Sequence, residues 1–134
     1  MVAMKCLFCD IVQGKEVAFN VWEDADFFAF LDNHPINPGH TILIPKAHIE
    51  NVFEMPDDAF QRLFLAAKKI ALILQKATSA KRIGIAVEGF GVPHVHVHLV
   101  PVNSGNELNP DRAKKAESAD LKNIQDLITK CKAA

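Results

Sequence analysis

The chain has 134 residues, of which 49% are hydrophobic and 23% are charged, and its formal net charge is −1. This length and composition are typical of one soluble globular domain with a single core, so we expect one domain over residues 1–134. The near-neutral charge offers no basic surface for nucleic acid, and no apolar run approaches the roughly 18 residues that span a membrane. We therefore expect neither nucleic acid nor a membrane as partner.

The N-terminal stretch holds two of the three cysteines, Cys6 and Cys9, as a C-x2-C pair. Residues 1–5 leave no room for a signal-peptide core, and the odd cysteine number argues against a disulfide framework, so we expect a cytoplasmic protein. The pair is typical of half a zinc site or of a redox pair, and unpaired structural cysteines remain possible. A redox pair is expected at the start of a helix, whereas here a short helical turn is predicted after the pair, ending at Gly14. Cys131 is interpreted as a bystander.

Two apolar runs, residues 17–23 and 27–31, predict an antiparallel hairpin, because only a short polar turn separates them. The second run is rich in phenylalanine and is expected to be buried. It stops at residues 32–35, where the sequence Asp-Asn-His-Pro predicts a turn. A further short strand is predicted over residues 41–44, and two histidines flank it, His40 and His48.

One long helix is predicted over residues 57–77, because apolar residues recur there at i, i+3, i+4 and i+7. Pro56 and the two aspartates after it suit the first turn. Leu65, Leu72 and Ile73 widen the apolar stripe beyond one face. The helix is therefore either deeply buried or covered on one side by a second subunit.

The remaining elements are a strand over residues 83–88, a strand that contains the histidine-rich run 94–101, a loop over 103–112 that reads as mobile, and a helix over 119–132 with Ser118 as its N-cap. Gly89-Phe90-Gly91 forms the turn between the last two strands, so these are expected to pair antiparallel. The prediction is an α+β fold: a meander of about five antiparallel strands, one long helix packed on it and a short C-terminal helix.

Three of the six histidines, His94, His96 and His98, alternate with apolar residues. In a strand they would share one face, with alternate residues roughly 6.5–7 Å apart, while Val95, Val97 and Leu99 would share the other. The simplest alternative is a half-buried strand whose polar face happens to be histidine. Histidine itself is needed only for function, since neutral imidazole is a nucleophile, a proton shuttle and a metal ligand.

This His-x-His-x-His run followed by apolar residues resembles the signature of the histidine triad (HIT) nucleotide hydrolases and transferases. Residues 32–48, with Pro-Gly-His, an apolar strand, Ile-Pro-Lys and a final histidine, resemble a second sequence block of that family. The resemblance covers about residues 6–101 and is weak over 102–134. It implies a HIT-like fold, a HIT domain with its core in 6–101, and a homodimer, which favours a second subunit on the long helix.

The resemblance also implies roles for the histidines. In the family the middle histidine is the nucleophile and carries a covalent nucleoside-monophosphate intermediate, which here is His96. His98 would contact the α-phosphate and the leaving-group side, and His40 would support the row from behind. His94 belongs to the row and also to an implied structural zinc site with Cys6, Cys9 and His48, a closed set of four nitrogen and sulfur ligands.

Nucleoside binding is implied by position. Leu7, Phe8 and Ile11 would form one wall of a base pocket and Phe30 and Leu31 the other, although each is also an ordinary core residue. Asp32 would accept hydrogen bonds from the ribose hydroxyls. One departure concerns the Gly-Gln-Ser/Thr loop of many family members: residues 88–93 are Glu-Gly-Phe-Gly-Val-Pro. Backbone N–H groups of Gly89 and Gly91 could replace part of its contact with phosphate.

The sequence thus predicts a hydrolase or transferase that releases a nucleoside monophosphate from nucleoside phosphoramidates or dinucleoside polyphosphates. A nucleotide-binding scaffold with weak activity is the alternative, because the loop before the triad lacks its glutamine. A metal-dependent hydrolase is less favoured. Three histidines along one strand would span about 13 Å, too far for all of them to bind one ion.

Overall fold

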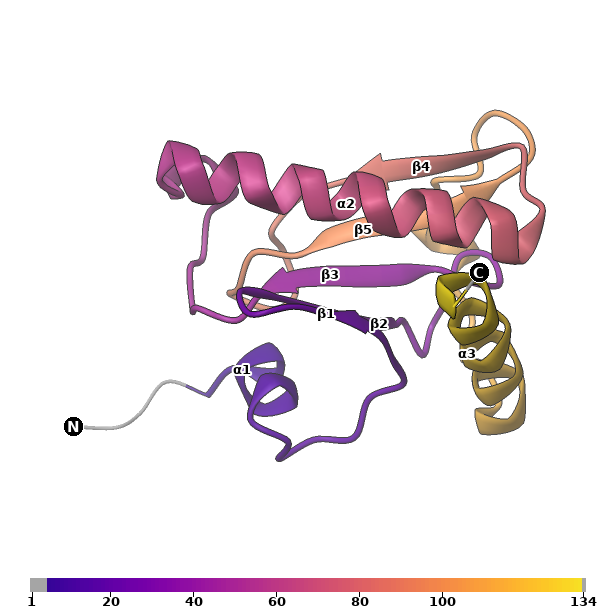
Figure 1. The fold of residues 1–134 in the computed structure, drawn as a ribbon, viewed down its shortest axis with the longest axis horizontal. Coiled ribbons are helices and arrows are strands. Elements are labelled where there is room, and N and C mark those ends of the chain that lie inside the picture. The colour runs from indigo at the N-terminus through magenta and orange to yellow at the C-terminus, as the bar shows by residue number, and fades with distance from the viewer. Residues whose placement is uncertain (1–4, 134) are drawn as a thin grey trace.

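The computed structural model describes residues 5–133 as a five-stranded antiparallel sheet with a long helix across one face (Figure 1). Residues 1–4 and 134 lie outside the described part, and they include most of the stretch considered for a signal peptide. The elements are α1 (Leu7–Val12), β1 (Asn20–Glu23), β2 (Phe27–Leu31), β3 (Thr41–Pro45), η1 (Val52–Glu54), α2 (Asp57–Thr78), β4 (Arg82–Ala86), β5 (Val97–Val102), η2 (Pro110–Arg112) and α3 (Ser118–Ala133). Within residues 5–133, no helix combines the length and the apolar character needed to cross a membrane.

The α+β class is confirmed, but the strands do not form the predicted meander. Their order is β1-β2-β3-β5-β4, with every neighbouring pair antiparallel. The chain leaves β3 through α2, reaches β4 at the sheet edge and returns as β5 between β4 and β3. A helical connection is long enough to pass over one strand position, whereas a tight turn is not. Local hairpin signals in the sequence do not reveal such a crossover.

Strands β2 and β3 are buried on both faces. Alternate residues of each strand therefore pack into two different cores, one on each side of the sheet. On one face Phe27, Ala29 and Leu43 pack with residues of α2, among them Leu63 and Ile70. On the other face Phe28, Phe30, Ile42 and Ile44 pack with Phe8 and Ile11 of α1. The sheet therefore separates a structural face, under α2, from a face that is left for the site.

Helix α2 confirms the predicted long helix and extends it by one residue at its C-terminus, where Ser79 ends it in the left-handed conformation with φ 58°. It buries Leu63, Ala66, Ala67, Ile70 and Leu74. Leu65 and Leu72 lie two turns apart on the other side and are 59% and 60% exposed in the single chain. Of the three residues that widen the apolar stripe, Leu65 and Leu72 are thus not used by this chain's own core, whereas Ile73 packs against it.

Two local predictions were wrong at the chain ends. Helix α1 begins at Leu7, between the two cysteines, and Cys6 caps it by accepting from the backbone N–H of Cys9. The C-x2-C pair therefore lies at the start of a helix, as a redox pair would, but in an antiparallel sheet fold rather than a thioredoxin-like one. Ser118 lies inside the first turn of α3, since the carbonyl of Glu117 accepts from Leu121.

Candidate functional site

The histidine run is only partly a strand, which corrects the prediction for residues 94–101. Strand β5 begins at Val97, and the residues from Gly91 to His96 approach it as bends and irregular chain. The N–H of Val95 donates to the carbonyl of Ile49 instead of joining the sheet. His96 and His98 still lie side by side, with ring centroids 5.1 Å apart. The ring of His94 points elsewhere, as described below.

One hydrogen bond fixes which ring nitrogen of His96 carries the proton in its neutral form. Its Nδ1 lies 2.7 Å from the carbonyl oxygen of His94, and a carbonyl can only accept, so Nδ1 carries the proton. The lone pair is then on Nε2. The side chain is only 5% exposed, and the ring of Phe8 packs edge-on against it at 5.1 Å. This is the tautomer that an attacking imidazole needs.

His40 and His98 form a second fixed pair. The backbone N–H of Ile36 donates to Nδ1 of His40 at 3.0 Å, so the proton of a neutral His40 is on Nε2. That Nε2 lies 2.9 Å from Nδ1 of His98 and 3.6 Å from Oδ2 of Asp32. His40 therefore donates to His98, and the proton of His98 is left on Nε2.

Burial keeps this pair neutral. It lowers the pKa of His40 to about 4, with the Asp32 carboxylate opposing the shift and His98 adding to it. Burial also lowers the pKa of His98, and His96 adds to that effect, while the carboxylates of Asp32 and Glu88 oppose it. At neutral pH the pair therefore offers directed N–H groups rather than fixed cations.

An apolar cavity of about 360 Å³ opens next to these histidines. It brings together seven of the eight residues that the sequence predicted for nucleotide binding: Leu7, Phe8, Ile11, Phe30, Leu31, Asp32 and Gly91. His96 and His98 line its inner end. The eighth residue, Gly89, does not line this cavity. The size and the lining of the apolar cavity suit an aromatic base with a polar group at one end.

Two further cavities meet at His96. An inner cavity of about 230 Å³ is lined by Asp32, His34, His40, Glu88, Phe90, His96, His98, Leu108 and Pro110 among others. An outer cavity of about 290 Å³ is lined by Glu50, Asn51, Val52, Phe53, Val87, Glu88, Gly89, Val95 and His96. Neither cavity was predicted. Phe90 lines both the apolar and the inner cavity. It belongs to the loop that departs from the family pattern, and that departure was the only sequence signal for Phe90.

The loop that reads as mobile in the sequence has defined contacts. The carboxylate of Glu107 accepts from the backbone N–H groups of Asn103 and Ser104, and Arg112 donates to Asn37 at 2.7 Å. These bonds hold Leu108 over Gly84, where an added Cβ would lie 2.9 Å from a Leu108 methyl group. Leu108 thereby forms one wall of the inner cavity, which sequence alone gave no reason to expect.

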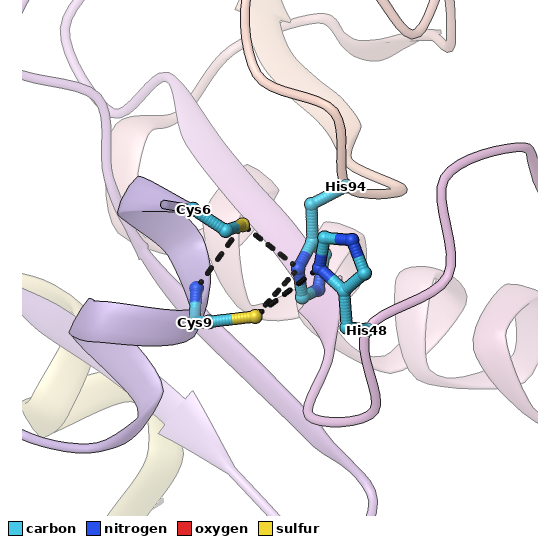
Figure 2. A group of neighbouring side chains, drawn as sticks. All are labelled: Cys6, Cys9, His48 and His94. Atoms are coloured by element: carbon cyan, nitrogen blue, oxygen red, sulfur yellow. Dashed lines mark hydrogen bonds between the residues drawn. The ribbon is translucent and has the colours of Figure 1, made fainter. Parts of the chain in front are cut away.

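The four residues predicted to hold a metal form one cluster, with ligand atoms within 4.8 Å of one another. Figure 2 shows Cys9 of α1 and Cys6, which caps this helix, facing the imidazoles of His48 and His94. The Nδ1 atom of His94 lies 3.4 Å from Sγ of Cys6 and 3.5 Å from Sγ of Cys9, and Nδ1 of His48 lies 3.2 Å from Sγ of Cys9. These separations are close to the edges of a tetrahedron around a zinc ion, about 3.3–3.8 Å for metal–ligand bonds of about 2.0–2.3 Å.

Surrounding groups prepare the cluster for a cation. The Nε2 of His94 lies 2.8 Å from the carbonyl of Pro45, which places the proton there and the Nδ1 lone pair toward the sulfurs. Glu50 lies 3.8 Å from Nε2 of His48, on the side away from the cluster. Burial, with Cys6 adding to it, raises the pKa of the Cys9 thiol to about 11. A cation would offset that cost of ionisation.

The side chain of His94 thus belongs to the cluster, while its carbonyl orients His96. Asp32, His40 and His98 form a second group whose ligand atoms lie within 4.8 Å of one another. There, however, Nε2 of His40 and Nδ1 of His98 are hydrogen-bonded to each other, and Nδ1 of His40 accepts from Ile36. A metal ion would have to break these bonds, so the geometry favours the hydrogen-bonded pair of His40 and His98 over a catalytic metal ion.

Known proteins resemble the chain in sequence and in structure. The HIT domain family model matches residues 13–105. An uncharacterized HIT-like protein of Saccharolobus solfataricus is 39% identical over 101 residues, covering 72% of this chain and 73% of that protein. The protein hit of Bacillus subtilis is 34% identical over 139 residues, covering 96% and 94%.

Two solved structures share the architecture. A HIT-like protein of Bartonella henselae superposes with a TM-score of 0.84 at 27% identity, covering 94% of this chain and 95% of that one. A zinc-bound histidine triad family protein of Mycobacterium smegmatis gives a TM-score of 0.82 at 27% identity, covering 96% and 93%. The chain therefore belongs to the HIT family, whose members are generally nucleotide hydrolases and transferases.

Proposed function

We propose that this protein releases a nucleoside monophosphate from nucleoside phosphoramidates or dinucleoside polyphosphates, through a covalent intermediate on His96. The observation that carries the proposal is the free Nε2 of His96, fixed by the 2.7 Å hydrogen bond from its Nδ1 to the carbonyl of His94. His96 lines all three cavities, so a phosphate bound where they meet would lie next to its ring.

In the first step a bond forms between Nε2 of His96 and the α-phosphorus, and the bond from phosphorus to the leaving group breaks. The leaving group takes that electron pair and a proton from a solvent water molecule, while the Nε2–H of His98 donates a hydrogen bond to it. In the second step a water molecule attacks the phosphorus, the bond to His96 breaks, and one proton of that water passes to the hydroxide left in the first step. His40 positions His98 in both steps, and directed N–H groups stabilise the phosphate oxygens.

The apolar cavity takes the nucleoside in this proposal. Phe8, Ile11 and Phe30 contact the base, and Asp32 accepts from the ribose hydroxyls. Asp32 is held for this task, because its Oδ1 accepts from the backbone N–H of His34 at 2.8 Å. Gly91, with φ 87°, brings the backbone close to the phosphate end, whereas Gly89 contacts only the outer cavity.

The Cys6, Cys9, His48 and His94 cluster holds a structural zinc ion in this proposal. Support comes from the donor set and from the zinc-bound relative of Mycobacterium smegmatis. With four protein ligands the ion has no open position, so it supplies a cross-link rather than chemistry. The link joins α1, which lines the apolar cavity, to the residue whose carbonyl orients His96. Reduced thiols agree with a cytoplasmic location.

We also propose a homodimer. Leu65 and Leu72 on the outer side of α2, and Ile85 on the edge strand β4, are 59%, 60% and 46% exposed in the single chain. Burying them against a second copy would remove apolar area from water. Light scattering at micromolar concentration should give twice the chain mass, and the double variant Leu65→Glu, Leu72→Glu should give the mass of one chain.

The direct test is steady-state hydrolysis of an adenosine phosphoramidate, with wild type and His96→Ala compared in the presence of EDTA. Turnover that is lost in the variant and survives the chelator supports histidine nucleophilic catalysis. Loss of wild-type turnover on chelation, with the fold intact by circular dichroism, would instead support a metal-dependent hydrolase. Binding of adenosine monophosphate without turnover of any substrate class would support the scaffold alternative.

A further inference from the structure

The cavities next to His96 are lined by carboxylates. Glu88 lines both the inner and the outer cavity, and Glu50 lines the outer one. The apolar cavity adds Glu16 and Asp32. No lysine or arginine is among the residues that line these three cavities, which all belong to the described part of the chain.

Two cations of the described chain, Arg112 and Lys46, are paired with other groups. Arg112, whose neighbours in sequence line the inner cavity, donates to Asn37 at 2.7 Å and pairs with Glu107 at 3.5 Å. Lys46, at the end of β3, pairs with Glu23 at 2.6 Å. Burial keeps His40 and His98 neutral. No lysine or arginine of the described chain therefore lines the three cavities, and the two buried histidines beside His96 are neutral.

This charge distribution separates the two substrate classes of the proposed function. A dinucleoside polyphosphate expels a nucleotide that carries several negative charges, and sites for such groups use lysine, arginine or a metal ion. An amine expelled from a phosphoramidate carries none. An amine with a second ammonium group would be attracted to a carboxylate beside the scissile bond.

We infer that Glu88 selects the leaving group: the protein prefers phosphoramidates whose amine bears a second cation, and it discriminates against polyphosphates. The inference rests on the proposed function, because it concerns the group that leaves when His96 attacks. Glu88 is suited to this role by position, since it borders both cavities next to His96 and is itself exposed, free to turn toward a bound cation. His96, by contrast, is only 5% exposed. The exposed carboxylate and the buried nucleophile therefore line the same two cavities.

Glu50 is less suitable as a test position. Its Oε1 lies 3.8 Å from Nε2 of His48, so a change there would disturb a residue of the metal cluster. Glu54 is a matched control, because it is exposed in η1, one residue after Phe53 of the outer cavity, yet lines none of the three cavities. Glu54→Gln removes the same charge from the same region.

The experiment compares three adenosine substrates: the 5′-phosphoramidate of butylamine, that of 1,4-diaminobutane, and diadenosine triphosphate. In the wild type, kcat/KM for the diaminobutane substrate should exceed that for the butylamine substrate by about two- to fivefold at low salt, the range of an exposed ion pair. The triphosphate should be the poorest substrate. The preference should shrink as ionic strength rises.

Glu88→Gln should bring the ratio of the two amine substrates to about one, and Glu88→Lys should reverse it and raise kcat/KM for the triphosphate. Glu54→Gln should leave the wild-type ratio unchanged. A wild-type ratio near one, or the same ratio in wild type and in both Glu88 variants, would overturn the inference while His96-dependent turnover persisted. Absence of His96-dependent turnover for all three substrates would overturn the proposed function instead.

Discussion

His40 donates through Nε2 to Nδ1 of His98 across 2.9 Å, and the backbone N–H of Ile36 fixes the direction of that bond. Strand pairing makes the contact possible. Ile42 of β3 lies opposite His98 of β5, so His40, two residues earlier on the same face, reaches the ring of His98. Two sequence blocks separated by 58 positions thereby meet in one proton-directing pair.

Removing the donor of this pair should slow the reaction without abolishing nucleotide binding. His40→Leu should lower kcat by about ten- to a hundredfold, the range for loss of a positioned acid–base partner, while KM changes little. His40→Gln places an amide N–H near the position of Nε2 and should recover part of kcat. Equal losses in both variants, with correct folding, would show that the donor is not what matters.

The same residue should make the protein sensitive to acid. The pKa of His40 is lowered to about 4, from about 6.5 in an unfolded chain, so the unfolded state binds the proton first as pH falls. The stabilisation is present above pH 6.5 and is lost as pH falls through 4, by up to about 3 kcal/mol.

Urea unfolding at pH 7.5 and pH 5.0 measures this loss, with His40→Gln as the reference that cannot titrate. Between the two pH values the wild type should lose about 1–2 kcal/mol more than the variant. Acid release of metal from the cysteine cluster affects both proteins and cancels in the comparison. Identical losses would show that His40 is not protonated on unfolding in this range.

Metal removal should destabilise the fold near α1. Elemental analysis of freshly reduced protein should find about one zinc per chain, and Cys9→Ser should abolish it. Because a structural zinc ion contributes folding free energy, Cys9→Ser should lower Tm by more than about 5 °C. Cys131→Ser, which changes the free cysteine of α3, should keep both the zinc and the Tm. Zinc-free wild-type protein from fresh, reduced preparations would refute the site.

The conformation of Gly91 should matter although the space around it is open. Its φ is 87°, and no atom lies within 4 Å of an added Cβ, so Gly91→Ala meets only backbone strain, about 1–2 kcal/mol. A shift of the loop should weaken nucleotide binding in calorimetric titration. Gly105→Ala, also in open space but without a positive φ, should leave stability and binding unchanged. Comparable effects of both changes would argue against a conformational role.

The sequence predicted site residues best where the chemistry of the site requires a particular residue type. The four residues of the metal cluster and seven of the eight residues predicted for nucleotide binding came from a family resemblance, and the structure brings each set together. The buried strand β2 follows from a short continuous apolar run and the helix α2 from 3.6-residue spacing, because both are local properties of the sequence.

What escaped prediction depends on contacts between distant segments. The crossover that inserts β5 between β3 and β4 has no local signature, and neither has Leu108 resting on Gly84. The alternation of His94, His96 and His98 suggested one straight strand, but Pro93 and the bends around it turn the ring of His94 into the metal cluster. The side chain of His94 consequently belongs to the metal cluster, whereas its carbonyl orients His96.

The central claim is that His96 carries the nucleotide, and the most direct measurement is to trap that species. Protein mixed with an adenosine phosphoramidate for milliseconds and quenched in alkali, where a phosphorus–nitrogen bond to histidine survives, should gain the mass of one adenylyl group. Peptide mapping should place it on His96, and His96→Ala should show none. Turnover in the wild type with the adduct on another residue, or with no adduct at any time point, would contradict the account.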